Sequence, residues 1–136
     1  MALTFQFEKN FSPILGTIYR PIAQVFLFSK STNRWQEVWM LVDTGADYTI
    51  LPKYVSKRLG VHLEKDCSIL KTGGIGGEEK VYFLKKIKAK LANWERQIPI
   101  GFLDRDDIPP LMGRHLFFET FEAIFSQNHS LTFSTK

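Results

Sequence analysis

Short runs of β-branched and aromatic residues, separated by turn-forming residues, recur along almost the whole chain. In the clearest run Ile87, Ala89 and Leu91 alternate with lysines. Alternation of period two is typical of a strand with one face in the core and the other in water. Other segments rich in strand-forming residues predict strands at 14–28, 35–42, 61–70, 81–91, 97–103, 122–125 and 130–133, with a polar hairpin loop at 29–34. We therefore predict an all-β chain that carries one or two short helices.

The first short helix is predicted just after Pro52. Residues 53–59 follow this proline, and Gly60 comes next. Proline in the first turn and glycine just past the end are typical of a helix. Val55 and Leu59 are four residues apart, so they would share the buried side of that helix.

Length and composition limit the class of protein. With 136 residues, 44% of them hydrophobic and 24% charged, the chain is predicted to be one globular domain, 1–136, in which 1–18 form an N-terminal extension or strand. No apolar run approaches the ~20 residues of a membrane helix. The start of the chain lacks a basic segment followed by an apolar one. We predict a cytoplasmic protein without a membrane partner.

Metal and disulfide chemistry has little support in the sequence. Cys67 is the single cysteine, which excludes a disulfide framework and a cysteine-based zinc site. His62, His115 and His129 lack the spacing of metal ligands. We expect no metal and no cofactor.

The net charge of +4 is mildly basic, and the lysines are densest between Lys80 and Lys90. A basic stripe can bind phosphates, but it can equally be a solvated strand face that discourages aggregation. No row of aromatic residues is interleaved with these lysines, as a single-strand binder would need. We therefore predict no nucleic-acid partner.

An Asp-Thr-Gly sequence follows the apolar end of the strand predicted at 35–42. Gly45 permits a sharp turn, and the Thr44 hydroxyl can hold the loop. Such a loop would present the Asp43 carboxylate at the end of a buried strand. The same residues are also good turn formers, so a plain turn and a site both remain open.

A glycine-rich segment occupies 73–77. It contains no Gly-Lys pair, so it is not a P-loop, and Glu79 stands where the dinucleotide fingerprint needs glycine. What remains is a hairpin whose tip presents backbone amides and Ile75, or else an idle flexible loop.

The third motif is Leu111-Met112-Gly113-Arg114. An arginine beside the core needs a carboxylate partner, and Asp47 is the obvious candidate; a surface arginine at a helix start is the alternative. Residues 114–121 are the second helix candidate, with Leu116, Phe117 and Phe121 directed inward.

Together and in this order, the three motifs resemble the retropepsin family of single-domain aspartic proteases, over about 39–133. The end of the chain is more similar to cellular or prokaryotic members than to retroviral ones. The resemblance implies a closed barrel with one lobe per chain. Tyr48, Glu78 and Glu79 depart from the retroviral pattern, and the segment before Asp43 is longer.

The resemblance also implies roles for individual residues. Asp43 would be the catalytic carboxylate, Thr44 would brace paired loops, Gly45 would accept substrate backbone, and Asp47 would pair with Arg114 in a buried ion pair. Substrate-binding and flap positions would be Ala46, Asp47, Gly73, Gly74, Ile75, Gly76, Gly77 and Leu111, with Leu41 and Ile50 as further pocket walls.

Aspartic-protease chemistry needs two carboxylates that share one proton, and this chain has one Asp-Thr-Gly. We therefore expect a homodimer about a two-fold axis that cleaves peptide or protein substrates. The apolar segments 3–7 and 131–133 are expected to pair across that axis as exposed strand edges. A non-catalytic dimerisation or peptide-binding module of the same fold is the alternative.

Overall fold

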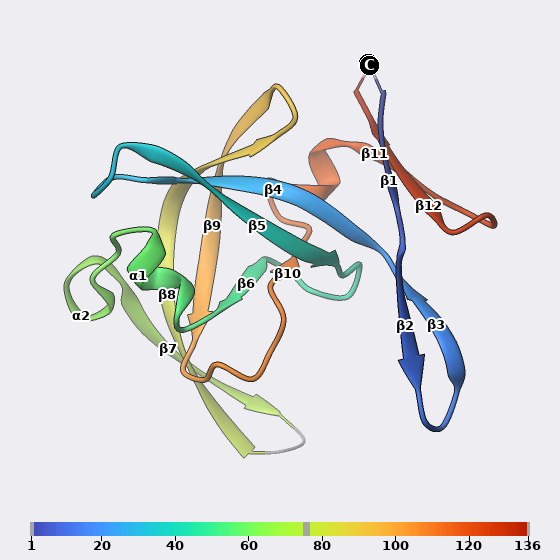
Figure 1. The fold of residues 1–136 in the computed structure, drawn as a ribbon. Coiled ribbons are helices and arrows are strands. Elements are labelled where there is room, and N and C mark those ends of the chain that lie inside the picture. Colours follow the sequence, from blue (N-terminus) through green and yellow to red (C-terminus); the bar gives the residue numbers. More distant parts are fainter. Residues whose placement is uncertain (1, 75–76, 136) are drawn as a thin grey trace.

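The computed structural model describes residues 2–74 and 77–135, and Figure 1 shows their arrangement. Strands dominate this part of the chain, as predicted. They are β1 (Ala2–Gln6), β2 (Glu8–Ser12), β3 (Gly16–Arg20), β4 (Ile22–Ser29), β5 (Arg34–Val42), β6 (Thr49–Pro52), β7 (Ser68–Gly74), β8 (Gly77–Leu91), β9 (Trp94–Leu103), β10 (Leu111–Met112), β11 (Glu122–Ser126) and β12 (Ser130–Ser134).

The main sheet has seven strands in the order β4-β5-β10-β6-β9-β8-β7. In addition β4 pairs with β8, through Phe26 with Lys90 and Leu27 with Ala89. Strand pairing therefore runs in a ring from β4 through β5, β10, β6, β9 and β8 back to β4, and β7 extends from β8 as the outer strand of a long hairpin.

The strands of this ring alternate between buried and wetter positions, and the core they form extends to buried residues of β12 and of the segment before β11. On β4, Ala23, Val25 and Leu27 are fully buried, and the residues between them are partly exposed. A fully buried aliphatic side chain contributes about 1.5–3 kcal/mol relative to an exposed one. The largest fully buried side chains are Leu27, Met40, Leu51, Leu59, Leu91, Ile98, Ile100, Phe102, Met112, Phe117, Leu131 and Phe133.

Helix α1 (Val55–Arg58) forms where the proline and glycine signals predicted it, and Val55 and Leu59 are each 1% exposed. The strand predicted at 61–70 is wrong in its first half, since helix α2 (Leu63–Asp66) replaces it. The cause is local: His62 Nδ1 accepts a hydrogen bond from the Lys65 amide at 3.3 Å, and Asp66 Oδ2 accepts one from the His62 amide at 2.7 Å. Side-chain bonds to nearby backbone compete with strand pairing in this way.

The helix predicted at 114–121 is also wrong. Only the single 3₁₀ turn η1 (Phe118–Thr120) forms there. Leu116 has φ of 58° and is 48% exposed, so it points away from the core, whereas Phe117 and Phe121 are buried as predicted. A left-handed backbone conformation at a leucine is costly and interrupts a helix.

Both ends of the described chain join one three-stranded sheet with the order β1-β12-β11 (Figure 1). The segment 131–133 is therefore the centre of that sheet and not an exposed edge, which corrects the sequence-based expectation. Within residues 2–74 and 77–135, no further strand pairs with the outer edge of β1 or of β11. Strands β2 and β3 form a separate hairpin, which supplies the extra residues before Asp43. No helix among the described residues has the length and apolar character needed to cross a membrane.

Candidate active site

The Asp-Thr-Gly loop lies where three strands meet. Strand β10 inserts between β5 and β6. It pairs in parallel with β5, where Leu111 lies opposite Leu41, and antiparallel with β6, where Leu111 lies opposite Ile50. The loop that joins β5 to β6 must therefore pass around the end of β10. This topology brings the first and third sequence motifs together although about 70 residues separate them.

The backbone fixes the position of the Asp43 carboxylate. The Asp43 amide donates a hydrogen bond to the carbonyl oxygen of Met112 at 3.1 Å. The Gly45 amide donates to Asp43 Oδ1 at 2.9 Å, and the Ala46 amide donates to the Asp43 carbonyl oxygen at 3.2 Å. This is the hydrogen-bonded turn that an aspartate makes with residues two and three further along. Asp43 is partly exposed, so its other oxygen can reach a ligand or a second carboxylate.

Gly113 allows the two motifs to approach closely. A Cβ placed on Gly113 would lie 2.6 Å from the Thr49 amide nitrogen and would overlap the carbonyl group of Tyr48. The Gly113 amide donates a hydrogen bond to Thr49 Oγ1 at 3.1 Å, and Thr49 is fully buried. Sequence reasoning missed Thr49; the available signal was a hydroxyl between apolar residues at the start of a short strand.

The Arg114 side chain, which is partly exposed, binds two residues of the Asp43 loop. Its Nη1 donates to the carbonyl oxygen of Thr44 at 2.8 Å, and its Nη2 lies 2.6 Å from Asp47 Oδ1. The Arg114 amide donates to Ala46 O at 3.0 Å, and the His115 amide donates to Asp47 O at 2.8 Å. The structure thus places Arg114 beside Asp47, the partner that the sequence indicated.

The expectation that this ion pair is buried is wrong for the single chain. The side chains of Arg114 and Asp47 are 43% and 83% exposed. Solvent screens such pairs, so the attraction itself contributes only about 0–1 kcal/mol. The guanidinium instead matters as a bridge that fixes the Thr44 carbonyl relative to Asp47.

Tyr48 forms one wall beside the loop. Its ring packs at right angles to Phe83 with centroids 5.6 Å apart, and it lies close enough to Gly101 that a Cβ there would be 2.8 Å from Tyr48 Cε2. Burial raises the pKa of the Tyr48 hydroxyl above its ordinary value, and the nearby Asp47 carboxylate adds to that rise. A cavity of about 350 Å³ adjoins this wall, lined by Asp47, Tyr48, Phe83, Pro99, Arg114, His115 and Glu119.

Leu41, Ile50 and Leu111 form a row across β5, β6 and β10. Their Cα positions are paired across the three strands, and paired residues point to the same face of a sheet. All three are partly exposed, whereas their neighbours Val42 and Met112 are buried. The face that carries Leu41, Ile50 and Leu111 is therefore an apolar surface still open to a ligand.

The glycine-rich hairpin is formed by β7 and the first part of β8, paired from Ser68 with Phe83 to Gly74 with Gly77. Gly73 and Gly74 lie near the end of one strand, and Gly77 begins the other. Ile75 and Gly76, the expected tip, lie outside the described residues.

An arginine that sequence reasoning did not single out anchors this hairpin. Arg105 Nη1 lies 3.0 Å from Glu79 Oε1 on β8, and the same guanidinium binds the Asp107 carboxylate. Arg105 lowers the pKa of Asp107 by hydrogen bonding and by charge. The polar run at 104–107 carried this signal, but the distant partner Glu79 could not be read from it.

Grouped metal ligands are absent among residues 2–74 and 77–135, where no three His, Cys, Asp or Glu side chains come together to hold an ion. His62 caps α2, and His129 stacks on Tyr19 with ring centroids 3.8 Å apart. Both imidazoles have structural contacts that account for their positions.

The fold and this loop define a retropepsin-like protein with one lobe per chain. The chain belongs to the aspartyl protease family, whose model matches residues 31–116 and so includes β5, the Asp43 loop and Arg114. In structure the chain is similar to a retropepsin-like aspartic protease from Rickettsia conorii. The sequences are 18% identical, the TM-score is 0.71, and the match covers 97% of this chain and 98% of that one. No match was found among curated protein sequences.

Proposed function

We propose that the protein is an aspartic endopeptidase whose active form is a homodimer. The observation that carries this proposal is the Asp43 carboxylate, which the Gly45 amide holds at 2.9 Å at the end of a buried strand. One such carboxylate per chain is half of an aspartic-protease site, because two must lie about 3 Å apart and share one proton. A second copy of the chain supplies the other half.

The shape of the loop supports pairing between two copies. Thr44 and Gly45 are exposed, so the tip of the loop is open to another chain. Arg114 Nη1 donates to the Thr44 carbonyl oxygen at 2.8 Å from within the same chain, and the exposed Thr44 side chain would face the partner's loop. A two-fold axis beside Thr44 would then bring both Asp43 side chains together.

Other features on the same side of the molecule support this dimer. Figure 1 shows three elements on the side away from α1 and α2: the β5–β6 loop, the three-stranded sheet of β1, β12 and β11 (the terminal sheet), and the β2–β3 hairpin. The open edges of β1 and β11 are available for pairing with another chain. The hairpin tip is apolar and exposed, with Phe11, Ile14 and Leu15 at 77%, 91% and 74%. Exposed apolar side chains grouped in this way are typical of protein interfaces.

The reaction follows from the two carboxylates. The ionised Asp43 takes a proton from a water molecule, whose oxygen attacks the scissile carbonyl carbon. The protonated Asp43 of the other copy donates its proton to the carbonyl oxygen. As the tetrahedral gem-diol collapses, the ionised Asp43 takes a proton from one of its hydroxyl groups, the C–N bond breaks, and the protonated Asp43 gives its proton to the leaving nitrogen, so the pair again holds one proton.

Substrate would bind as an extended peptide between the floor of the site and the glycine-rich hairpin. The row of Leu41, Ile50 and Leu111 supplies an apolar floor, and the exposed backbone at Gly45 offers hydrogen bonds to the peptide main chain. Closure of the β7–β8 hairpin over the peptide would exclude water from the reacting bond. Arg105 would not touch the peptide. It would position the hairpin that covers the peptide, because it binds Glu79 on β8.

The proposal is tested by incubating the purified protein with a diverse peptide library from pH 3 to pH 7, with and without pepstatin. We expect site-specific cleavage that pepstatin and Asp43→Asn abolish. Asp106→Asn is the matched control, because Asp106 lies outside the loop and its Oδ1 accepts from the Tyr54 amide at 2.8 Å, which an amide oxygen can also do. Cleavage that persists in pure Asp43→Asn would overturn the assignment. Peptide binding without any cleavage would favour the non-catalytic module.

A further inference from the structure

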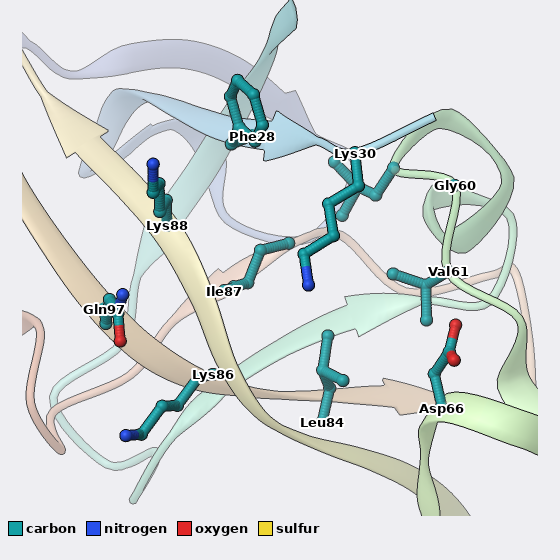
Figure 2. Close-up of a pocket in the computed structure, with 11 residues that line it drawn as sticks. Phe28, Lys30, Gly60, Val61, Asp66, Leu84, Lys86, Ile87, Lys88 and Gln97 are labelled. Carbon is teal, nitrogen blue, oxygen red and sulfur yellow. The ribbon is translucent and has the colours of Figure 1, made fainter. Parts of the chain in front are cut away.

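A cavity of about 680 Å³ lies beside α1 (Figure 2). In Figure 1, α1 lies on the other side of the main sheet from the loop that follows β5. The walls of the cavity come from the end of β4, the segment after α1 and the middle of β8. A volume of this size is within the range of ordinary ligand sites, about 300–1,000 Å³. Nothing in the proposed protease mechanism uses it.

Strand β8 has an open edge inside this cavity. On the side away from β9, β7 pairs with β8 as far as Phe83, and β4 pairs with it from Ala89 onward. Among the described residues no strand pairs with this edge at 84–88. On the other side of β8, the register of its pairing with β9 shifts between Leu84 and Ile87, so the strand is irregular along this stretch. Unpaired strand edges are the sites at which extended peptides add to a sheet.

The two faces of β8 at this edge differ in chemistry. Ile87 is buried and Leu84 is partly buried on the inner face, whereas Lys86 and Lys88 are exposed on the outer face. Figure 2 shows the Leu84 and Ile87 side chains directed into the cavity, and Lys86 and Lys88 on the other side of the strand. A strand added here would meet apolar side chains on one face and ammonium groups on the other.

Other residues that line the cavity add to both its apolar and its basic character. Val61 faces Leu84 across the cavity, and Lys30 extends from the β4–β5 loop toward Ile87 (Figure 2). Lys88 Nζ lies 5.3 Å from the centre of the Phe28 ring. No ion pair among the described residues involves Lys30, Lys86 or Lys88. The acidic residue of the lining, Asp66, already accepts a hydrogen bond from the His62 amide.

We propose that this cavity binds an extended peptide segment in which acidic and apolar residues alternate. Its backbone pairs with the open edge of β8 at 84–88. Its apolar side chains contact Leu84, Ile87 and Val61, and its carboxylates face Lys86 and Lys88. The cavity is thus a docking site for a protein partner, separate from the Asp43 loop and independent of whether that loop cleaves peptides.

A peptide fits this site better than a nucleic acid does. Three lysines alone would attract any polyanion. The apolar side chains of Leu84, Ile87 and Val61 offer nothing to a sugar–phosphate chain. The unpaired edge carries backbone acceptors as well as donors, which an added strand satisfies and a phosphate chain does not. Phe28 is the one aromatic residue in the described lining, and Lys88 already covers its ring, so no surface for base stacking is left there.

The test uses the full chain and a fluorescein-labelled pentapeptide, Glu-Val-Glu-Val-Glu, in a fluorescence polarisation titration. The matched probe, Glu-Glu-Glu-Val-Val, has the same composition and charge without the alternation. We expect saturable binding of the first peptide and at least about tenfold weaker binding of the second. The double variant Lys86→Glu/Lys88→Glu should also weaken binding at least about tenfold, because it sets like charges across the added strand. The control Lys9→Glu/Arg20→Glu changes the net charge equally on the β2–β3 hairpin, outside the cavity, and should alter affinity less than about twofold.

Amide hydrogen exchange provides a readout specific to strand addition. The alternating peptide should slow exchange of amides within 84–88, and a backbone N-methylated version of it should bind more weakly. Equal binding of both pentapeptides, equal effects of the two double variants, or unchanged exchange at 84–88 would each overturn the proposal. Displacement of the peptide by single-stranded DNA at the same concentration would show a general polyanion surface instead, and would also overturn it.

Discussion

Gly113 is packed against the backbone of Tyr48 so closely that no side chain fits between them. This contact joins β10 to the end of the Asp43 loop, and it determines how near the Leu111–Arg114 segment can come to that loop. Through it, the position of the proposed catalytic carboxylate depends on a residue that is 70 positions away in the sequence.

Gly113→Ala should therefore unfold the site or destabilise the whole chain. Its Cβ would meet backbone atoms of Tyr48 and Thr49, which cannot move aside as a side chain can. Overpacking of this kind costs about 1–3 kcal/mol or more. Gly101→Ala is the comparison, because its Cβ would meet the side chains of Val81 and Tyr48 instead. Urea denaturation should show the larger loss for Gly113→Ala; equal losses would contradict the rigid contact.

Thr49→Val should destabilise the same junction through a lost hydrogen bond. Thr49 Oγ1 accepts from the Gly113 amide at 3.1 Å, and Val removes the acceptor while preserving the shape of the side chain. Leaving a buried amide without a partner costs about 1–3 kcal/mol. Thr49→Ser retains the hydroxyl and should recover most of the hydrogen-bond contribution. If Val and Ser variants have the same midpoint in urea, the bond contributes nothing.

Arg114→Ala should affect activity much more than stability. The Arg114–Asp47 pair is exposed, so its loss should lower the free energy of unfolding by only about 0–1 kcal/mol. The loop, however, loses the bond that fixes the Thr44 carbonyl. Asp47→Asn keeps that bond and serves as the control, with a smaller loss of cleavage rate expected. A loss of several kcal/mol in Arg114→Ala would show that the pair becomes buried in the dimer, which measurement at several protein concentrations would reveal.

The fold and the candidate site could be predicted from the sequence only in part. The strands β4 and β5 were predictable because both segments are rich in β-branched and aromatic residues, and the Asp43 loop because Asp-Thr-Gly follows an apolar strand. Helix α2 was not, because it depends on hydrogen bonds that His62 and Asp66 make with nearby backbone. The exposed position of Leu116 depends on a positive φ that no local pattern indicated.

Contacts between distant segments were the other limit. Thr49 and Arg105 are ordinary polar residues in the sequence, and they matter only because folding sets them against Gly113 and Glu79. The central position of β12 in the terminal sheet was likewise hidden, since an apolar run does not reveal which strands flank it.

Arg105 binds both Asp107 and Glu79, and this bridge between the two carboxylates leads to a prediction about pH. Arg105 lowers the pKa of the Asp107 carboxyl, so the bridge is complete above the ordinary pKa of an aspartate. The Arg105–Asp107 part of the bridge is lost as pH falls through the lower pKa of the folded state. Carbon-detected NMR should find Asp107 titrating below its ordinary value. Arg105→Gln should return its pKa toward that value, and Lys71→Gln should not; an unchanged pKa in Arg105→Gln would refute the assignment.

The central claim is that two copies of Asp43 form one active site, and a mixing experiment tests it most directly. Wild-type chains are allowed to exchange with a ninefold excess of Asp43→Asn chains, and cleavage is measured per wild-type chain. If the site needs both carboxylates, only wild-type chains paired with each other are active, so activity per wild-type chain should fall to about one tenth. The same excess of wild-type-like Asp106→Asn chains should add activity instead. Activity per wild-type chain that is unaffected by excess Asp43→Asn, in a mixture shown to exchange subunits, would contradict the shared site.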